Sequence, residues 1–242
     1  TNYHFVLWYG AERTILVKHE LYQYALPPIQ PARWLYLSSI GSGTEKYHDE
    51  IADYLAKNPE VKFAFQPGTF QITLGTEKLR ALYERAEVLF VNREEAERIL
   101  TITKRTENFV SRRSPRREGE ADEIFSSQSD IFKGLRALGP KIVCVTDGLK
   151  GAYMADESGA YFMPPYPDPK PPLERTGAGD AFAATFVSYL ALGKTPLEAL
   201  RLAPINSAYV VQDIGAQRGL LSREALEKYL ASAPTNYQPR KI

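Results

Sequence analysis

A run of small residues around one carboxylate is the part of the sequence best suited to chemistry. Thr176-Gly-Ala-Gly-Asp180 precedes a long apolar run that is compatible with a helix. The backbone N–H groups of Gly177, Ala178 and Gly179 can approach a ligand closely, because no large side chain covers them, and a helix N-terminus adds positive potential. Asp180 could accept a proton from a hydroxyl beside a bound anion. The pattern predicts an anion site with a neighbouring base, and its alternative is a purely structural strand-to-helix turn.

A second pair of polar residues stands where a buried strand gives way to a helix. Asn92 follows the apolar run 88–91, and Glu95 comes three residues later, so the two share one face of the helix start. An amide and a carboxylate in this position suit water-mediated contacts to Mg²⁺ and phosphate. An ordinary helix cap is the structural alternative and is favoured when the motif is taken alone.

A glycine-containing turn ends another strand-like run. Thr146-Asp-Gly-Leu-Lys-Gly151 places Gly148 and Gly151 where the backbone can come close to a ligand. An ordinary turn into a hairpin explains the same residues. The triplet at 193–195 is not a phosphate-binding loop, because it follows a helix and lacks the required earlier glycine; Thr195 to Glu198 reads as a capping box.

The segments that must position these residues alternate between strand-like and helix-like patterns. Short apolar runs at 34–37, 61–65, 88–91 and 141–146 alternate with helix-like segments at 45–57, 76–85, 94–100 and 129–138. This order favours a mainly parallel sheet that is covered by helices, with ligands bound outside the carboxyl ends of the strands. Residues 38–43, 67–68, 92 and 146–148 would lie there. Helices dominate from residue 178, and Pro204 predicts a kink or a helix end near Ala203.

Composition limits the classes of function. The 242 residues carry 30 basic and 29 acidic side chains, so the net charge of +1 gives no reason to expect nucleic acid or a membrane as partner. The lone Cys144 excludes an internal disulfide, and the three histidines are too scattered to form a zinc site. We expect a soluble cytoplasmic protein with a small-molecule partner.

Residues 104–123 break the alternation. They contain clustered arginines followed by clustered acids and almost no apolar side chain. We predict a charged, solvated loop or insertion there, and an RNA-binding segment is the weaker alternative.

Taken together and in this order, the motifs resemble those of the ribokinase-like (PfkB) family of carbohydrate and nucleoside kinases over essentially the whole chain. The residues that carry the resemblance are Thr176 to Phe182, Asn92 with Glu95, Val145 to Ala152, Asn206 to Ala208, and Gly215 with Ala216. The resemblance implies a Rossmann-like three-layer α/β/α core with a mostly parallel sheet and a small β lid.

The resemblance also implies roles for individual residues. Asp180 would be the catalytic base, and the N–H groups of Gly177, Ala178 and Gly179 would form the anion hole. Asn92 and Glu95 would organise Mg²⁺ through water, and a monovalent cation such as K⁺ is a further expected cofactor. The expected ATP-binding residues are Thr146, Gly148, Gly151, Thr176, Asn206, Gly215 and Ala216.

The activity implied is ATP-dependent phosphorylation of a hydroxyl group on a sugar or sugar-like substrate. A nucleoside kinase of the same family is one alternative, and a non-catalytic nucleotide-binding module is another. Residues 1–20 would form a β-hairpin that is part of the lid and could join two copies into a homodimer, and residues 21–242 would form the core. The resemblance begins partway into the family pattern, so we expect that the native enzyme has a segment before Thr1. Glu174-Arg175 also departs from the family's usual Asp-Thr pair at that point.

Overall fold

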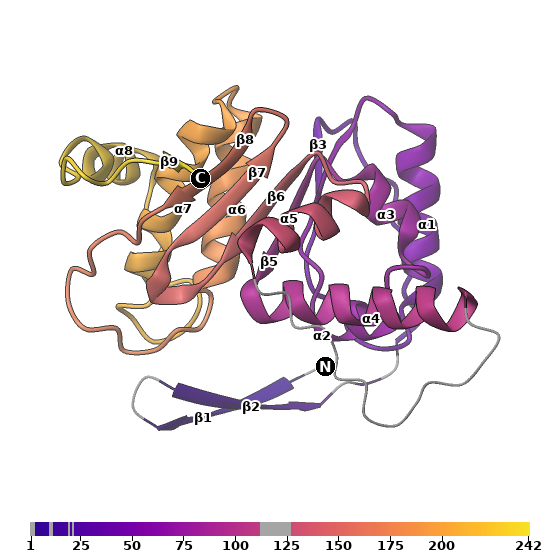
Figure 1. The fold of residues 1–242 in the computed structure, drawn as a ribbon. Coiled ribbons are helices and arrows are strands. Elements are labelled where there is room, and N and C mark those ends of the chain that lie inside the picture. The colour runs from indigo at the N-terminus through magenta and orange to yellow at the C-terminus, as the bar shows by residue number, and fades with distance from the viewer. Residues whose placement is uncertain (1–2, 10–11, 19, 21, 112–126) are drawn as a thin grey trace, which may run out of the picture. The chain divides into compact units, whose positions relative to one another are not determined.

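A computed structural model describes residues 3–9, 12–18, 20, 22–111 and 127–242 of the chain (Figure 1). The chain divides into two compact units. Unit 1 contains Thr1–Tyr22, Thr146–Met154 and Ser158–Ile242, and unit 2 contains Gln23–Val145 and Ala155–Glu157. The strands form a two-stranded sheet, β1-β2, and a seven-stranded sheet in the order β3-β4-β5-β6-β7-β8-β9.

The N-terminal strands form the predicted hairpin. β1 (Tyr3–Tyr9) pairs antiparallel with β2 (Glu12–Lys18), and Val6 lies opposite Ile15 in the register. Side chains from both faces of this hairpin are exposed, with Phe5 61% and Leu16 51% accessible to solvent. Because side chains alternate between the two faces of a strand, Val6 and Ile15 lie on one face and Phe5 and Leu16 on the other, so each face carries exposed apolar side chains.

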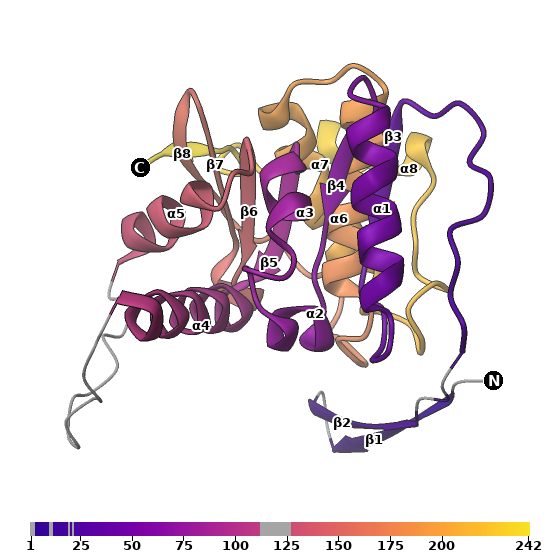
Figure 2. The same ribbon diagram turned by 90° about the vertical axis from the view of Figure 1, so that its right-hand side faces the viewer.

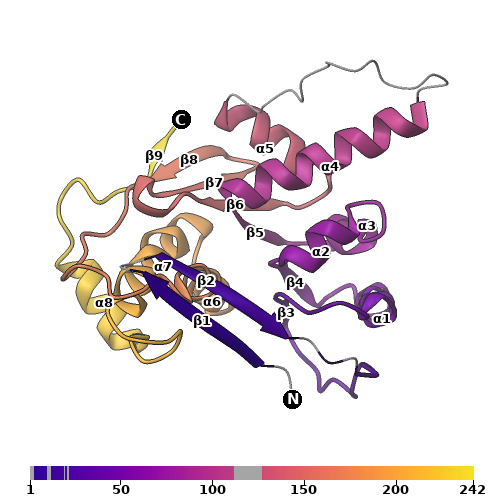
Figure 3. The same cartoon turned by 90° about the horizontal axis from the view of Figure 1, so that it is seen from below.

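Unit 2 contains the parallel part of the sheet. Its strands are β3 (Trp34–Leu37), β4 (Lys62–Phe65), β5 (Val88–Asn92) and β6 (Ile142–Thr146), and β4 runs parallel to both β3 and β5. Its helices lie along one side of these strands (Figures 2 and 3). They are α1 (Glu45–Lys57), α2 (Thr69–Leu74), α3 (Arg80–Arg85), α4 (Arg93–Ser111) and α5 (Gln128–Ala137).

An aromatic cluster fills the space between β4 and α3. Phe63 stacks on Phe65, and Phe65 meets the edge of Tyr83 with ring centroids 5.2 Å apart. All three side chains are almost fully buried. Burial of rings of this size is worth several kcal/mol of hydrophobic free energy, on the order of 2–3 kcal/mol per side chain. The cluster therefore fixes α3 against the strand whose C-terminal end leads toward the loop at residue 66.

Two expectations about the helices of unit 2 were wrong. Residues 76–85 do not form one helix. α2 ends before them at Gly75, which adopts a φ of 92°, and α3 begins only at Arg80. α4 continues to Ser111, into the segment 104–123 where we predicted a loop, since Lys, Arg and Glu are strong helix formers even without an apolar face. The remainder of that predicted loop lies outside the described residues.

Unit 1 packs its helices on one side of its strands (Figures 1 and 3). The strands are β7 (Ala152–Asp156), β8 (Gly159–Met163) and β9 (Arg240–Lys241), and a 3₁₀ turn (Gly148–Lys150) precedes them. The helices are α6 (Ala178–Ala191), α7 (Pro196–Val210) and α8 (Arg223–Ala231).

α7 corrects the expectation of a helix end near Ala203. Pro204 lies inside the continuous helix and is buried between the buried residues Ala203 and Ile205. Proline removes one backbone hydrogen bond from a helix interior, and the burial of these apolar side chains offsets that loss. Among the described residues, no helix has both the length and the apolar character needed to cross a bilayer.

Candidate active site

The small-residue run forms a tight turn at the start of α6. Gly177 precedes the helix with a left-handed φ of 83°, and Ala178 is the first helical residue. A Cβ on Gly177 would lie 2.7 Å from the Cβ of Ala216, which is closer than real Cβ contacts come. Only glycine therefore fits, both for its backbone conformation and for the contact it makes. The turn therefore brings Gly177 into contact with Ala216, and the sequence predicted both residues for the same site.

A pocket of about 330 Å³ opens in front of this turn. We call it the glycine pocket. Thr146, Gly148, Gly151, Ala178 and Gly179 line it, and the sequence predicted all five for the site. Apolar side chains, among them Phe182, Pro204, Ala208 and Val211, line it as well. Glycine backbone together with apolar side chains suits a ligand with phosphates and an aromatic ring.

The amide groups of the turn differ in their availability. Ala178 N–H makes a long hydrogen bond of 3.5 Å to Arg175 O, and Ala181 N–H donates to Gly177 O at 2.8 Å. Gly179 lies between them in the first turn, where an α-helix offers its N–H groups no intrahelical acceptor. Its N–H is the best-placed donor of the turn for an anion.

Thr176 adds a polar group to the same turn. Its hydroxyl is buried and has no hydrogen-bond partner among the described residues. A buried hydroxyl without a partner is costly unless a ligand or water satisfies it. The orphaned hydroxyl is therefore an independent indication that a polar ligand fits at the start of α6.

Two charged residues of the glycine pocket were not given roles by the sequence. Arg175 is exposed and lines the pocket, as does Asp168. Partial burial raises the pKa of Asp168, and the positive charge of Arg175 lowers it. Asp168 lies in a proline-rich stretch, residues 164–172. Because proline restricts the backbone, this stretch was the signal in the sequence for an ordered loop.

Asp180 lies outside the lining of the glycine pocket. It is exposed in the first turn of α6 and lines a neighbouring cavity of about 520 Å³ together with Thr185, Asn206 and Ala216. Successive residues of a helix point in directions about 100° apart, so Gly179 and Asp180 serve adjacent spaces. The arrangement places a carboxylate in the cavity next to the turn at Gly177.

The predicted residues Asn206 and Gly215 both make contacts within the protein. Asn206 Nδ2 donates to Thr185 Oγ1 at 2.8 Å, and its Oδ1 accepts from Leu221 N at 3.0 Å. Gly215 N donates to Glu174 Oε1 at 2.7 Å. These contacts hold the segment after α7 against α6 and the turn, so both residues shape the site through their neighbours.

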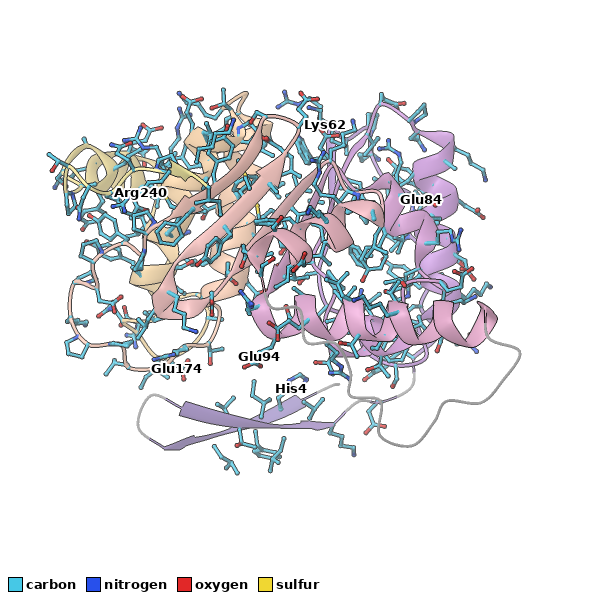
Figure 4. All side chains as sticks on the ribbon, viewed as in Figure 1. His4, Lys62, Glu84, Glu94, Glu174 and Arg240 are labelled. Carbon is cyan, nitrogen blue, oxygen red and sulfur yellow. The ribbon has the colours of Figure 1, made fainter. Side chains whose placement is uncertain are left out.

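Glu174 is a further residue of the site that was not given a role by the sequence. Its side chain is only 4% exposed, and Figure 4 labels it in the segment that leads into α6. The backbone on its N-terminal side is held as well, because Leu173 N donates to Val211 O at 2.9 Å. The signal in the sequence was the unusual acid before the small-residue run.

Asn92 and Glu95 cap each other in unit 2. Glu95 N donates to Asn92 Oδ1 at 2.8 Å, and Asn92 N donates to Glu95 Oε2 at 2.8 Å. Glu94, beside them in the first turn of α4, is labelled in Figure 4. These reciprocal bonds are those of a capping box. The described residues contain no group of three or more His, Cys, Asp or Glu side chains that could hold a metal ion, so the Mg²⁺ role of the pair stays a prediction.

The strand ends β3 and β4 of unit 2 also meet as expected. A Cβ on Gly68 would lie 1.9 Å from Ser39 Oγ, so the loops 38–43 and 67–68 are in direct contact. Gln71 links them, because its Nε2 donates to Ser38 O at 3.2 Å and its Oε1 accepts from Gly68 N at 2.7 Å. The same Nε2 lies 3.2 Å from Nε2 of the buried His48.

Comparison with known proteins gives concordant matches. The sequence pattern of the pfkB family carbohydrate kinases matches residues 1–223. Ribokinase of Bacillus subtilis is 36% identical over 114 residues, a region that covers 47% of this chain and 38% of that protein. The chain thus spans well under half the length of this curated relative.

Solved structures show the same fold. The nucleoside kinase of Methanocaldococcus jannaschii, a member of the ribokinase family, superposes with a TM-score of 0.64 at 19% identity, covering 85% of this chain and 58% of that one. Arabidopsis thaliana ribokinase complexed with ribose and ATP gives a TM-score of 0.60 at 19% identity, covering 90% and 65%. These similarities confirm the predicted three-layer α/β/α ribokinase-type fold.

Proposed function

The chain belongs to the pfkB family of carbohydrate kinases, and from this membership we propose that it phosphorylates a hydroxyl group of a sugar or sugar-like substrate with ATP. The observation that supports the proposal is the turn at Gly177, because the helix start that follows it lines the glycine pocket with Ala178 and Gly179 and the neighbouring cavity with Asp180. This is the arrangement that phosphoryl transfer needs, because the transferring group must be held beside a proton acceptor.

The roles follow from where the groups lie. The apolar side chains of the glycine pocket, including Phe182 and Val211, hold the adenine of ATP. Gly148 and Gly151 have no side chain, so the backbone there can come close to the nucleotide. The γ-phosphoryl group lies at Gly179, whose N–H stabilises the charge that develops on its oxygens. Asp180 accepts the proton of the acceptor hydroxyl as that oxygen bonds to the γ-phosphorus. The bond from the γ-phosphorus to the bridging oxygen breaks, and ADP leaves.

Cations complete the proposal. Mg²⁺ would neutralise negative charge on the phosphates of ATP, and Asn92 and Glu95 are the residues that would hold its water ligands. The carboxylate of Glu95 also caps α4, so its second role adds to a structural one. A monovalent cation such as K⁺ is part of the same proposal.

The acceptor is proposed to be a sugar because the curated relative with 36% identity is a ribokinase. A nucleoside acceptor is the alternative within the family. The discriminating experiment measures ADP formation from ATP and Mg²⁺ with a panel of pentoses, hexoses and nucleosides. Stimulation of ADP formation by a sugar supports the proposal, and stimulation by nucleosides alone supports the nucleoside kinase instead. No stimulation by any acceptor refutes a kinase that acts on these classes of substrate.

A non-catalytic nucleotide-binding module is the second candidate. The observation in its favour is that Asp180 does not line the glycine pocket, so nucleotide could bind there without reaching the carboxylate. Calorimetry separates the candidates, since this reading requires ATP binding with no acceptor-dependent turnover.

The hairpin β1-β2 is proposed to act as part of a lid over the acceptor. Phe5, Leu7, Leu16 and Val17 are each more than half exposed, and apolar surface of this kind is suited to covering a substrate or a second copy of the chain. We include a homodimer formed through this hairpin and a cytoplasmic location in the proposal. Sedimentation of the wild type and a Leu16→Asp variant tests the dimer, which should dissociate in the variant.

A further inference from the structure

A cavity of about 500 Å³ lies in unit 1 among α6, α7, α8 and the segment that follows α8. We call it the α8 cavity. Its lining shares no residue with that of the glycine pocket among the described residues. Tyr189, on the last turn of α6, lines it, whereas the anion-binding turn lies at the other end of the same helix. The 12 residues from Ala178 to Tyr189 span about 16 Å of helix, so the α8 cavity is distinct from the glycine pocket.

The first unusual feature of the α8 cavity is the hydroxyl of Tyr189. The side chain is only 3% exposed, and its hydroxyl is buried with no hydrogen-bond partner among the described residues. Tyrosine hydroxyls in protein interiors usually find a partner, and a buried hydroxyl without one is destabilising. Burial and the negative charge of Glu227 raise the pKa of Tyr189, so the hydroxyl keeps its proton and can donate.

The second feature is the guanidinium of Arg201 on α7. Its Nε is buried and has no hydrogen-bond partner, and in the described part of the chain the guanidinium makes no ion pair. An arginine presents a planar fork of donors that matches an oxyanion, and a buried donor on a cation needs an acceptor. Arg201 and Tyr189 therefore line one cavity with unsatisfied donors.

The acidic residues of the α8 cavity do not satisfy these donors, because each is engaged elsewhere. Glu198 accepts from Lys194 Nζ at 3.1 Å and from Thr195 N at 2.8 Å in the capping box of α7. Glu227 accepts from Arg223 Nε at 2.8 Å within α8. With these charges paired, the guanidinium of Arg201 leaves an unbalanced positive charge in the cavity.

The rest of the lining combines apolar and polar side chains and indicates the character of the occupant. Leu202, Leu230, Ala231, Ala233 and Pro234 form apolar walls, and Lys194, Thr235 and Gln238 add polar groups. A cavity of this volume is large enough for a small metabolite, and it combines apolar walls with a few convergent polar groups, as ligand sites do.

We propose that the α8 cavity binds a small molecule that carries one oxyanion group, a phosphate or a carboxylate, which Arg201 and Tyr189 hold together. The apolar remainder of the ligand contacts the leucines and Pro234. Tyr189 also lines the cavity that contains Asp180, but the proposed oxyanion site does not use Asp180, and it stands whether or not the chain phosphorylates a sugar.

The test is a thermal-unfolding titration of the 242-residue chain with inorganic phosphate in one arm and acetate in the other. A ligand that binds only the folded state raises the midpoint of unfolding with its concentration. Phosphate can also meet the turn at Gly177, but that contribution is the same in the wild type and in Arg201→Gln, because Arg201 lines neither the glycine pocket nor the cavity of Asp180. The difference between them therefore reports the cavity alone.

Three variants make the test specific. Arg201→Gln should lose most of the anion-induced rise, and the matched control Arg240→Gln, an exposed arginine on β9 labelled in Figure 4, should keep it. Tyr189→Phe keeps the ring and removes only the unpartnered hydroxyl. It should be at least as stable as the wild type without anion, because an unsatisfied polar group is lost, and it should respond more weakly to anion.

A larger rise with phosphate than with acetate identifies a phosphate ligand, and the reverse identifies a carboxylate, provided that Arg201→Gln and Tyr189→Phe diminish the rise. Equal rises in the wild type, Arg201→Gln and Tyr189→Phe, or no rise with either anion at tens of millimolar, would overturn the proposal.

Discussion

The carboxylate of Glu174 accepts a 2.7 Å hydrogen bond from the backbone N–H of Gly215, a residue 41 positions later in the chain. Glu174 is buried immediately before the small-residue run, and Gly215 precedes Ala216, against which Gly177 packs. One bond therefore ties the turn at Gly177 to the segment that follows α7. The geometry of the turn depends on this link as well as on its own glycines.

Replacement of Glu174 should loosen the site. Glu174→Ala should lower the free energy of unfolding by about 2 kcal/mol, because it removes a charged acceptor and leaves the Gly215 N–H unsatisfied. Nucleotide affinity should fall with it. Glu174→Gln keeps an acceptor oxygen and should lose less of both. Urea denaturation and calorimetric titration with ATP measure the two quantities, and equal stability of the Ala and Gln variants would contradict the role of this bond.

Gly177→Ala should be damaging for two separable reasons. The left-handed φ of 83° costs about 1–2 kcal/mol for any residue with a Cβ, and the added methyl would also press on Ala216. Gly193 is a matched control, since its φ is 84° and nothing lies within 4 Å of a Cβ there. Gly193→Ala should show the backbone cost alone, by urea denaturation, and should bind ATP like the wild type. If both variants lose the same stability and bind ATP equally, the close packing at Gly177 is unimportant.

Glu95→Gln should separate capping from cation binding. A glutamine can still accept from Asn92 N, so the midpoint of thermal unfolding should change little. Loss of the carboxylate should raise the Mg²⁺ concentration needed for half-maximal activity several-fold. Glu198→Gln makes the same change in the capping box of α7 and should leave the Mg²⁺ requirement unaltered. The cation role of Glu95 fails if the two variants have the same Mg²⁺ dependence.

His48 should make stability depend on pH. Burial lowers the pKa of His48 below its ordinary value of 6.5. Its Nδ1 lies 2.7 Å from Thr44 O, so Nδ1 carries the proton and Nε2 accepts from Gln71, and a second proton would remove that acceptor. The unfolded chain therefore binds the proton more readily, and stability is full above pH 6.5 and falls as the pH drops toward the lower, folded-state pKa.

Thermal unfolding between pH 7.5 and 5 tests this expectation. His48→Gln should flatten the decline that the wild type shows below about pH 6.5. The exposed His4 supplies a control, and His4→Gln should leave the decline unchanged. A wild type whose midpoint is constant over this range would show that protonation of His48 is not linked to folding.

Local patterns predicted much of the fold. The apolar spacing of residues 45–57 predicted α1 with the observed bounds, and Thr195 with Glu198 forms the predicted capping box of α7. Where tertiary packing determines whether a helix continues, the sequence was less informative. Pro204 stays inside α7 because burial outweighs a missing hydrogen bond, and no local pattern reveals that.

The candidate site was predictable in its backbone and less so in its side chains. Gly148, Gly151 and Gly179 line the glycine pocket as expected, because glycine spacing reports directly on turns and close approach. The partnership of Glu174 with Gly215, and the shared cavity of Tyr189 and Arg201, join positions that are distant in the sequence. Such pairs follow from the packing of α6, α7 and α8, which only the folded structure provides.

The proton-acceptor role of Asp180 is the central claim, and one paired measurement tests it most directly. ADP release is followed with ATP, Mg²⁺ and the best acceptor of the sugar panel, for the wild type and Asp180→Asn, with ATP binding measured in parallel by calorimetry. We predict acceptor-dependent turnover in the wild type and a loss of at least a hundredfold in Asp180→Asn, on the order that general-base catalysis contributes, with ATP binding retained. Undiminished turnover by Asp180→Asn, or ATP binding without any acceptor-dependent ADP release by the wild type, would contradict the account.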